Sequence, residues 1–171
     1  CSVCLPGLAN RMANLGVTVV TQPSFLYYSG DRYLKTVQNS QKPHLYPIGS
    51  MLSGALHVGF GSDFPIVDAN PLTGIYAAAT RMTEGGNSVL PKEAITASDA
   101  LRLYTLDAAA AVFEEAVKGS IVPGKLADLI LLEEDPRKIE ARRIKDIQVQ
   151  LTMVDGRIAW SSDEFLWTTT P

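Results

Sequence analysis

The carboxylate of Asp63 is the first candidate for a chemically active group in this sequence. It follows the apolar run 58–60 across a corner of two small residues, Gly61 and Ser62. A buried parallel strand delivers a side chain to its C-terminal end in this way, and α/β proteins place their chemistry at that end. From the local sequence alone, however, a turn-capping role for Asp63 is favoured, because aspartate commonly closes turns.

Other residue types that often do chemistry favour structural roles here. Cys1 and Cys4 are spaced C-x-x-C, but the sequence has neither a strand before them nor a second ligand pair, so we expect free thiols in a cytoplasmic protein. His57 opens a predicted strand, far from its active end, and is expected in the core or an interface, and His44 on the surface. Ser62 lacks the G-x-S-x-G context of a nucleophile.

Four further residues could take part in chemistry or in structure. Asp68 is expected to be solvated or to cap a helix, and Asp128 to make a structural hydrogen bond. Arg81 near a predicted helix end is expected to be solvated or to interact with the helix dipole. Tyr28 follows a predicted strand and either contacts a substrate or packs under a loop.

The composition indicates a globular protein and excludes several classes. The chain has 171 residues, 46% of them hydrophobic, and a net charge of -3. Without a basic stripe, binding to nucleic acid is not expected, and no apolar run approaches the ~20 residues of a membrane span. The sequence opens without methionine inside what resembles a folded element, which predicts a piece of a longer chain.

Helix and strand patterns alternate along residues 1–115, as in βα units with parallel strands. Strands are predicted at 17–20, buried on both faces, and at 57–60; residues 25–41 are predicted as a loop with a short helix near 33–37. Further helices are expected at 6–15, 47–55, 70–82 (with Asn70 as N-cap), after Thr96 and at 108–113.

Residues 116–171 follow a different pattern and are predicted to form a small β unit with a tail. Strands are expected at 119–122, 127–132 and 147–154, with an Asp155-Gly156 hairpin turn leading into 157–160. The predicted fold class is therefore α/β: the last βα units of a larger domain, followed by a β unit.

Six segments give the chain a specific resemblance. They are LGVTVVTQPSF, HVGFGSDFP, NPLTGIYAAATR, AITASDALRLYTLDAAAAVF, KGSIVPGKLADLILLEEDP and TMVDGRIAW. Together they resemble the C-terminal third of a metal-dependent amidohydrolase, of the subfamily that includes N-substituted formamide deformylases and exoenzyme-regulator-like proteins.

The resemblance implies the C-terminal portion of a (β/α)₈ TIM barrel, with residues 17–20 and 57–60 as its seventh and eighth strands, over residues 1–115. Residues 116–171 would be part of a composite β-sandwich. Asp63 would then be a ligand of a divalent metal, zinc in our expectation, and would accept the proton of the attacking water. The implied reaction is hydrolysis of a non-peptide C–N bond in a small amide or formamide.

The sequence departs from this family in its metal ligands. It has two histidines and no His-x-His pair, and one carboxylate cannot hold a catalytic ion, so we expect the chain alone to be inactive and metal-free. The alternative is a non-catalytic amidohydrolase-like protein that regulates or binds a ligand. An open barrel edge also predicts self-association, or binding to the remaining part of the barrel.

Overall fold

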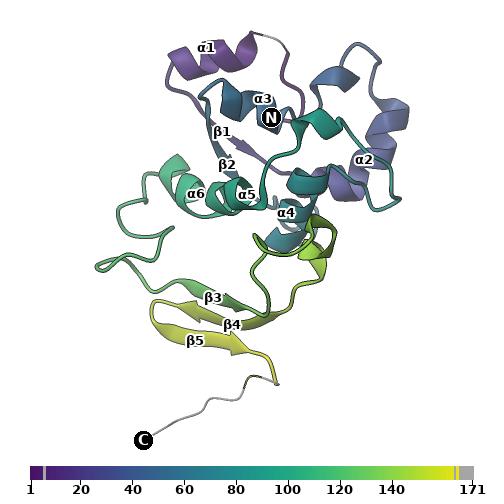
Figure 1. The fold of residues 1–171 in the computed structure, drawn as a ribbon. Helices are drawn as coiled ribbons and strands as arrows, with labels where there is room; N and C mark the ends of the chain where they lie inside the picture. The colour runs from purple at the N-terminus through teal and green to yellow at the C-terminus, as the bar shows by residue number, and fades with distance from the viewer. Residues whose placement is uncertain (6, 164, 166–171) are drawn as a thin grey trace, which may run out of the picture.

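Two short parallel strands form the centre of the first part of the molecule. The computed structural model describes residues 1–5, 7–163 and 165, so residues 166–171 of the predicted second unit lie outside it. Strand β1 (Thr18–Thr21) pairs in parallel with β2 (His57–Phe60), in a register that places Thr21 opposite Phe60 (Figure 1). The two strands therefore end at the same edge.

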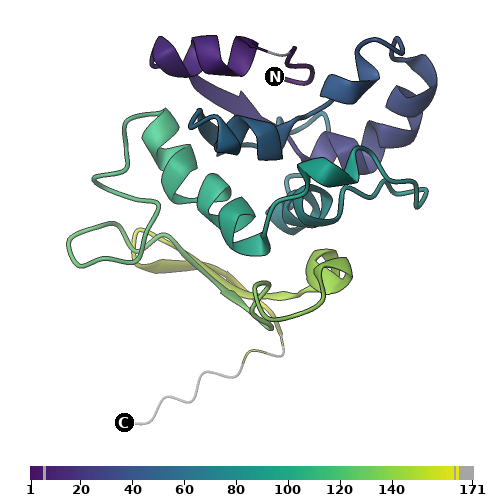
Figure 2. The same ribbon diagram turned by 45° about the horizontal axis from the view of Figure 1, so that its top comes forward.

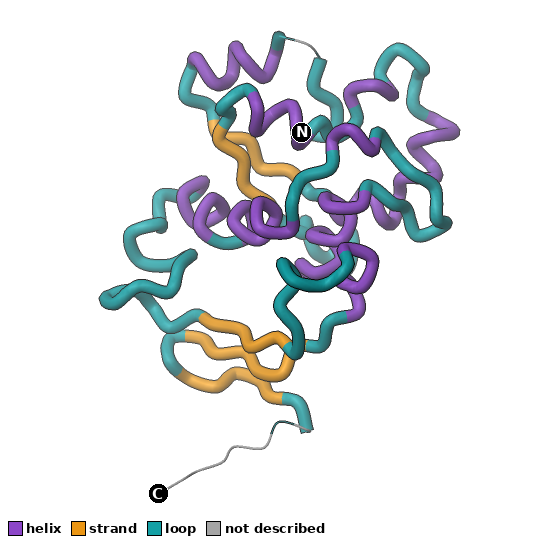
Figure 3. Tube along the Cα trace, in the orientation of Figure 1, coloured by secondary structure: helices purple, strands orange, loops and turns teal. Residues whose placement is uncertain are grey.

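Helices surround this pair of strands, and Figure 3 shows them filling most of the upper part of the molecule. They include α1 (Leu8–Asn14), α2 (Ser24–Thr36), α3 (Ile48–Ser53), α4 (Pro71–Thr80), α5 (Ala97–Tyr104) and α6 (Leu106–Ala111). Three short 3₁₀ helices are η1 (Lys42–His44), η2 (Pro91–Glu93) and η3 (Ala141–Asp146). No helix in the described part of the chain is long and apolar enough to cross a membrane.

Side-chain caps fix the starts of α4 and α5, as predicted. The Asn70 side chain accepts a hydrogen bond from Leu72 N at 2.9 Å. The Thr96 hydroxyl accepts one from Asp99 N at 3.1 Å. Each cap satisfies a backbone N–H group that has no partner within its own helix.

The prediction of a loop over residues 25–41 is wrong for most of that segment. The 13-residue helix α2 occupies it, starting directly after Pro23. Its aromatic residues lack a clear helical period in sequence, but Tyr27 packs edge-on against Tyr76 of α4, with ring centroids 5.6 Å apart. Tertiary packing of this kind stabilises helices whose local pattern is weak.

The prediction that residues 17–20 are buried on both faces is also wrong. Val19 and Thr21 point into the core with Val58 and Phe60, whereas Val20 on the other face is 48% exposed. The β-branched sequence of β1 does not indicate that one of its faces is exposed, because its buried face and its exposed face carry equally apolar residues.

A second, antiparallel sheet follows in the order β3 (Leu129–Leu132), β4 (Val149–Val154) and β5 (Arg157–Ser161). Asp155 and Gly156 form the predicted tight turn, with positive φ angles of 49° and 72°. Asp128 makes the structural hydrogen bond expected of it, accepting from Asp155 N at 2.8 Å. Residues 119–122 form bends and coil rather than the predicted strand.

One hydrophobic core runs through both parts of the chain. Helices α5 and α6 lie between the two sheets (Figure 2), and η3 packs against α4. Ile144 and Ile147, from the middle of the second part, are fully or almost fully buried in the same cluster as Leu72 and Ile75 of α4. The boundary near residue 115 therefore stays a prediction.

Candidate active site at the end of strand β2

The Asp63 corner lies at the C-terminal edge of the parallel strands. Gly61 N donates a hydrogen bond to Thr21 O at 3.1 Å, which continues the pairing of β2 with β1 by one residue. The chain then leaves the sheet at Ser62 and Asp63. The structure thus places Asp63 at the edge where the sequence predicted it.

Asp63 itself adopts an unusual backbone conformation and carries a free side chain. Its φ is 59°, in the left-handed region that glycine, asparagine and aspartate adopt more readily than other residues. Its backbone carbonyl accepts from Ile66 N at 3.0 Å. Its carboxylate is exposed and accepts no hydrogen bond from any residue that the structure describes.

Neighbouring side chains, and not that of Asp63, accept the hydrogen bonds from backbone N–H groups around this turn. Ser62 Oγ accepts from Phe64 N at 3.2 Å, and Asp68 Oδ1 accepts from Asn70 N at 2.9 Å. Asp68 is exposed, as expected, and holds the residue that caps α4, so the cap itself is Asn70 and not Asp68. The Asp63 carboxylate is left without such a role, although its chemical function stays a prediction.

Tyr28 lies on the first turns of α2, where this helix faces the start of α4. Burial raises the pKa of its hydroxyl, an interaction with Thr73 lowers it, and the negative charge of Asp68 raises it again. Its ring packs edge-on against Tyr27, with centroids 5.1 Å apart, while about a third of Tyr28 stays exposed. Tyr28 therefore both packs between helices and remains accessible from outside.

The chemistry of a metal site can be tested on these residues. An exposed, unpaired carboxylate suits a hard or borderline cation as one ligand. Within the described residues, however, no group of three His, Cys, Asp or Glu side chains is placed to hold an ion. Cys1 and Cys4 are both free thiols, one exposed and one buried.

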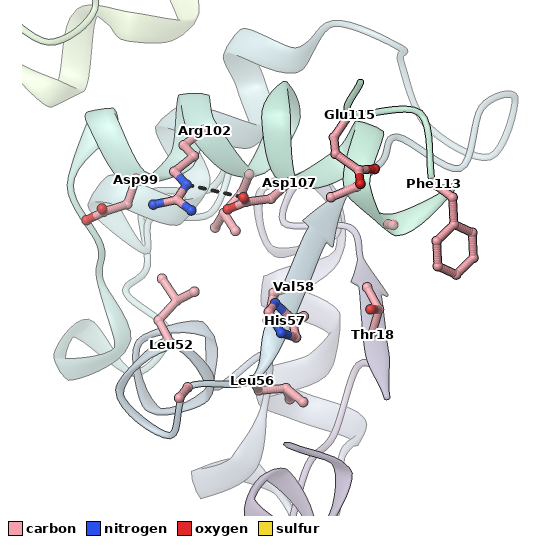
Figure 4. A pocket seen from close by; sticks show the side chains of 14 residues that line it. Thr18, Leu52, Leu56, His57, Val58, Asp99, Arg102, Asp107, Phe113 and Glu115 are labelled. Atoms are coloured by element: carbon pink, nitrogen blue, oxygen red, sulfur yellow. Dashed lines mark hydrogen bonds and ion pairs between the residues drawn. The ribbon is translucent and has the colours of Figure 1, made fainter. Parts of the chain in front are cut away.

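His57 lies away from Asp63, and His44, which was expected on the surface, is half-buried at the end of η1. His57 is exposed at the opposite end of β2, beside a cavity of about 500 Å³ (Figure 4), so it is not a core histidine. Arg102 and Asp107 form an ion pair of 3.2 Å on the α5 and α6 side of this cavity. His57 lies at the N-terminal end of β2, the end at which barrels place residues for stability rather than for chemistry.

The expectation that Arg81 is solvated is wrong, while its position directly after α4 leaves the interaction with the helix dipole a prediction. Its side chain is fully buried and donates hydrogen bonds to the carbonyl oxygens of Leu45 and Val89, at 3.1 and 3.0 Å. Glu93, which the sequence did not single out, is 4% exposed in the same region. The pattern of apolar residues in a sequence indicates which apolar side chains are buried, but no feature of the neighbouring sequence indicates that a charged side chain is buried.

Comparison with known proteins places this geometry in a family. The model of the amidohydrolase family matches residues 1–159. The N-substituted formamide deformylase of Arthrobacter pascens is 34% identical over 151 residues, which cover 88% of this chain and 28% of that protein.

Two solved structures share the fold. An uncharacterized metal-dependent hydrolase from Pyrococcus horikoshii OT3 superposes with a TM-score of 0.71 at 27% identity, over 82% of this chain and 29% of that one. An adenosine deaminase from Xanthomonas campestris, solved with bound zinc, gives a TM-score of 0.66 at 21% identity, over 99% and 38%. The chain thus spans under two fifths of these proteins, and by its match over residues 1–159 it belongs to the amidohydrolase family.

Proposed function

We propose that this chain contributes the seventh and eighth barrel strands, and part of a composite β-sandwich, to a metal-dependent hydrolase of amide or formamide C–N bonds. In this proposal β1 and β2 are those strands, and residues 116–171 belong to the β-sandwich. The 34% identity to a formamide deformylase supports the reaction class. The metal-dependent hydrolase that shares the fold at 27% identity supports a metal.

The observation that carries the proposal is the free carboxylate of Asp63. It is exposed at the C-terminal edge of parallel strands, and its neighbours Ser62 and Asp68 perform the capping hydrogen bonds. A side chain held in a left-handed backbone conformation without a structural task suits a functional one.

Asp63 would have two tasks in this reaction. When bound, a divalent cation, zinc in our proposal, lowers the pKa of water. One Asp63 carboxylate oxygen would serve as a ligand of the ion, and the carboxylate would accept a proton as the water attacks the carbonyl carbon. Further ligands would come from residues outside this chain, since one carboxylate cannot hold a catalytic ion.

The test uses the complete protein and the variants Asp63→Asn and Asp68→Asn. We expect Asp63→Asn to lower kcat/KM on N-substituted formamides by ~10²–10⁴-fold, the usual contribution of a general base. Bound metal, measured by elemental analysis, should fall as well. Asp68→Asn keeps the same charge change five residues away and should leave both quantities near wild type.

Two results would contradict this proposal. Wild-type protein that binds ligands but hydrolyses no amide or formamide would favour the non-catalytic alternative. Full activity in Asp63→Asn would remove the proposed role of Asp63. For the 171-residue chain by itself we propose that it is inactive and metal-free, which turnover with added zinc would contradict.

We also propose that the isolated chain self-associates or binds the remaining part of the barrel. Large apolar side chains are exposed along its first strand and in its loops, including Leu15 at 75%, Val20 at 48%, Phe64 at 68% and Phe113 at 91%. Light scattering coupled to gel filtration tests this, and a clean monomer at high concentration would contradict it. The two free thiols support the further proposal of a reducing, cytoplasmic location.

A further inference from the structure

Arg81 is a buried cation with one side of its guanidinium unsatisfied. It follows α4 in a left-handed conformation (φ 60°) and is 0% exposed. Nε donates to Val89 O at 3.0 Å and Nη2 to Leu45 O at 3.1 Å. Nη1 has no acceptor among the described residues, although it is buried.

A buried guanidinium of this kind destabilises the folded protein unless another group contacts Nη1. A buried charged donor without an acceptor forfeits its hydration, which is among the most destabilising features a protein can hold. Burial lowers the pKa of Arg81 to about 10 and the charge of Glu93 raises it, so the guanidinium is still cationic at neutral pH. Arg81 therefore does not avoid this destabilisation by losing its proton.

Glu93 is the complementary buried charge. It ends η2 and is 4% exposed. Oε2 accepts from Ser50 N at 2.8 Å and Oε1 from Ser50 Oγ at 2.7 Å. Each carboxylate oxygen keeps a further lone pair, and none of the hydrogen bonds of Arg81 within the described chain goes to Glu93.

The two charges hold opposite ends of one segment, residues 45–50. Arg81 binds its first residue, Leu45, and Glu93 binds its last, Ser50. Between them Tyr46 has a φ of 44°, and Gly49 approaches Glu93 so closely that an added Cβ would lie 3.4 Å from the Glu93 Cα atom. This segment starts α3, which leads directly into β2 and so to Asp63.

We propose that Arg81 and Glu93 form one buried charge pair bridged by an ordered water at Nη1, and that this pair fixes segment 45–50 and thereby positions β2. Water is the occupant that the charges favour. The carboxylate of Glu93 nearby disfavours an anion, and the guanidinium disfavours a cation, whereas water can accept from Nη1 and donate to an oxygen.

A double-mutant cycle in the complete protein tests the pair, with Arg81→Met, Glu93→Gln and the double variant. We expect each single variant to lower the melting temperature clearly, because each leaves the other charge buried and uncompensated. The double variant should lose less than the sum of the two. Arg102→Met, which removes an arginine whose side chain is 67% exposed, is the matched control and should cost little.

Additive losses in that cycle would overturn the pair. If a single variant does not fold, a high-resolution crystal structure of the wild type decides instead. Density for a water at ~2.7–3.2 Å from Nη1 is the expected result. A chloride at that position, or a protein acceptor, would overturn the bridge.

The positioning role rests on the proposed function and has its own measurement. In the complete protein loaded with Co²⁺, we expect Arg81→Lys to change the visible absorption spectrum of the ion and weaken its binding, because lysine cannot bind Leu45 and Val89 as a fork. An unchanged spectrum and affinity would overturn the positioning role. Wild-type protein that binds no Co²⁺ would instead count against the proposed function, while the thermal cycle would still test the pair.

Discussion

Two carboxylates of this protein, those of Asp63 and Glu93, are treated in opposite ways by the fold. Asp63 is exposed at the end of β2 and accepts no hydrogen bond from the described residues, while Glu93 is 4% exposed and accepts two from Ser50. Asp63 lies three residues after β2, and Glu93 is the last residue of η2. The fold thus gives the buried carboxylate two donors from Ser50 and leaves the exposed one without a donor among the described residues.

The charges around them follow the same division. Near Asp63, local capping is done by Ser62 and Asp68. Near Glu93, burial lowers the pKa of Arg81 and the negative charge of Glu93 raises it. We therefore expect substitutions at the two carboxylates to separate activity from stability.

The substitution Asp63→Ala in the complete protein gives the strongest test of the difference between Asp63 and Glu93. We expect activity to fall by at least ~10²-fold. The free energy of unfolding should change by no more than about 0.5 kcal/mol, because an exposed side chain without partners contributes little. Denaturant titration alongside kinetics checks both values, and a strongly destabilised variant would show that Asp63 does have a structural task.

Glu93→Gln should give the reverse result. It leaves Arg81 buried without a compensating charge, so we expect a loss of about 3–5 kcal/mol of stability. Ser50→Ala is a milder control, since it removes one hydrogen bond to Glu93 and keeps both charges. A Glu93→Gln variant as stable as wild type would remove the contrast between the two sites.

Asn70→Ala tests the local caps beside Asp63. Asn70 accepts from Leu72 N at the start of α4, so its loss should destabilise the protein by about 1 kcal/mol. Thermal unfolding measures this, and Asn70→Asp, which can keep the cap, should restore most of it. If alanine at position 70 cost nothing, α4 would not depend on the cap that the structure shows.

Asp31 is a third carboxylate that can be compared with Asp63 and Glu93, and its substitution has the smallest expected effect on stability. It accepts from Thr83 Oγ1, Asn87 Nδ2 and Gly85 N, and the bond from Asn87 is the largest cause of its lowered pKa. A lowered folded-state pKa means stability that is present above the ordinary aspartate pKa and is lost as the pH falls through the folded-state value.

We therefore expect wild type to lose slightly more stability than Asp31→Asn between about pH 5 and pH 3, the range around and below the ordinary pKa. Melting temperatures across that range measure the difference. Equal pH dependence in the two proteins would show that the three hydrogen bonds do not favour the ionised form.

Much of the fold near Asp63 was predictable because its determinants are local. These determinants are the apolar run of β2, the small residues of the corner, the Asn70 cap and the Thr96 cap, and each depends only on residues a few positions apart. The Asp155-Gly156 turn is equally local, since it depends on two residues that tolerate positive φ. Patterns that involve only neighbouring residues can be recognised in a single sequence.

The region of Glu93 was not predictable for the converse reason. Arg81 reaches Leu45 across 36 positions, and Glu93 reaches Ser50 across 43. The helix α2 in place of a loop, and the open face of β1, likewise depend on which surfaces meet in space. None of these contacts changes the local residue pattern.

The sequence by itself determined the α/β class, the strand at 57–60 that precedes Asp63, and the resemblance to amidohydrolases that the family match confirms over residues 1–159. Only the tertiary structure decided which charges are buried and which carboxylate stays free. The physical reason is that hydrophobic periodicity and capping act along the chain, whereas the cost of burying a charge is set by partners brought together by folding.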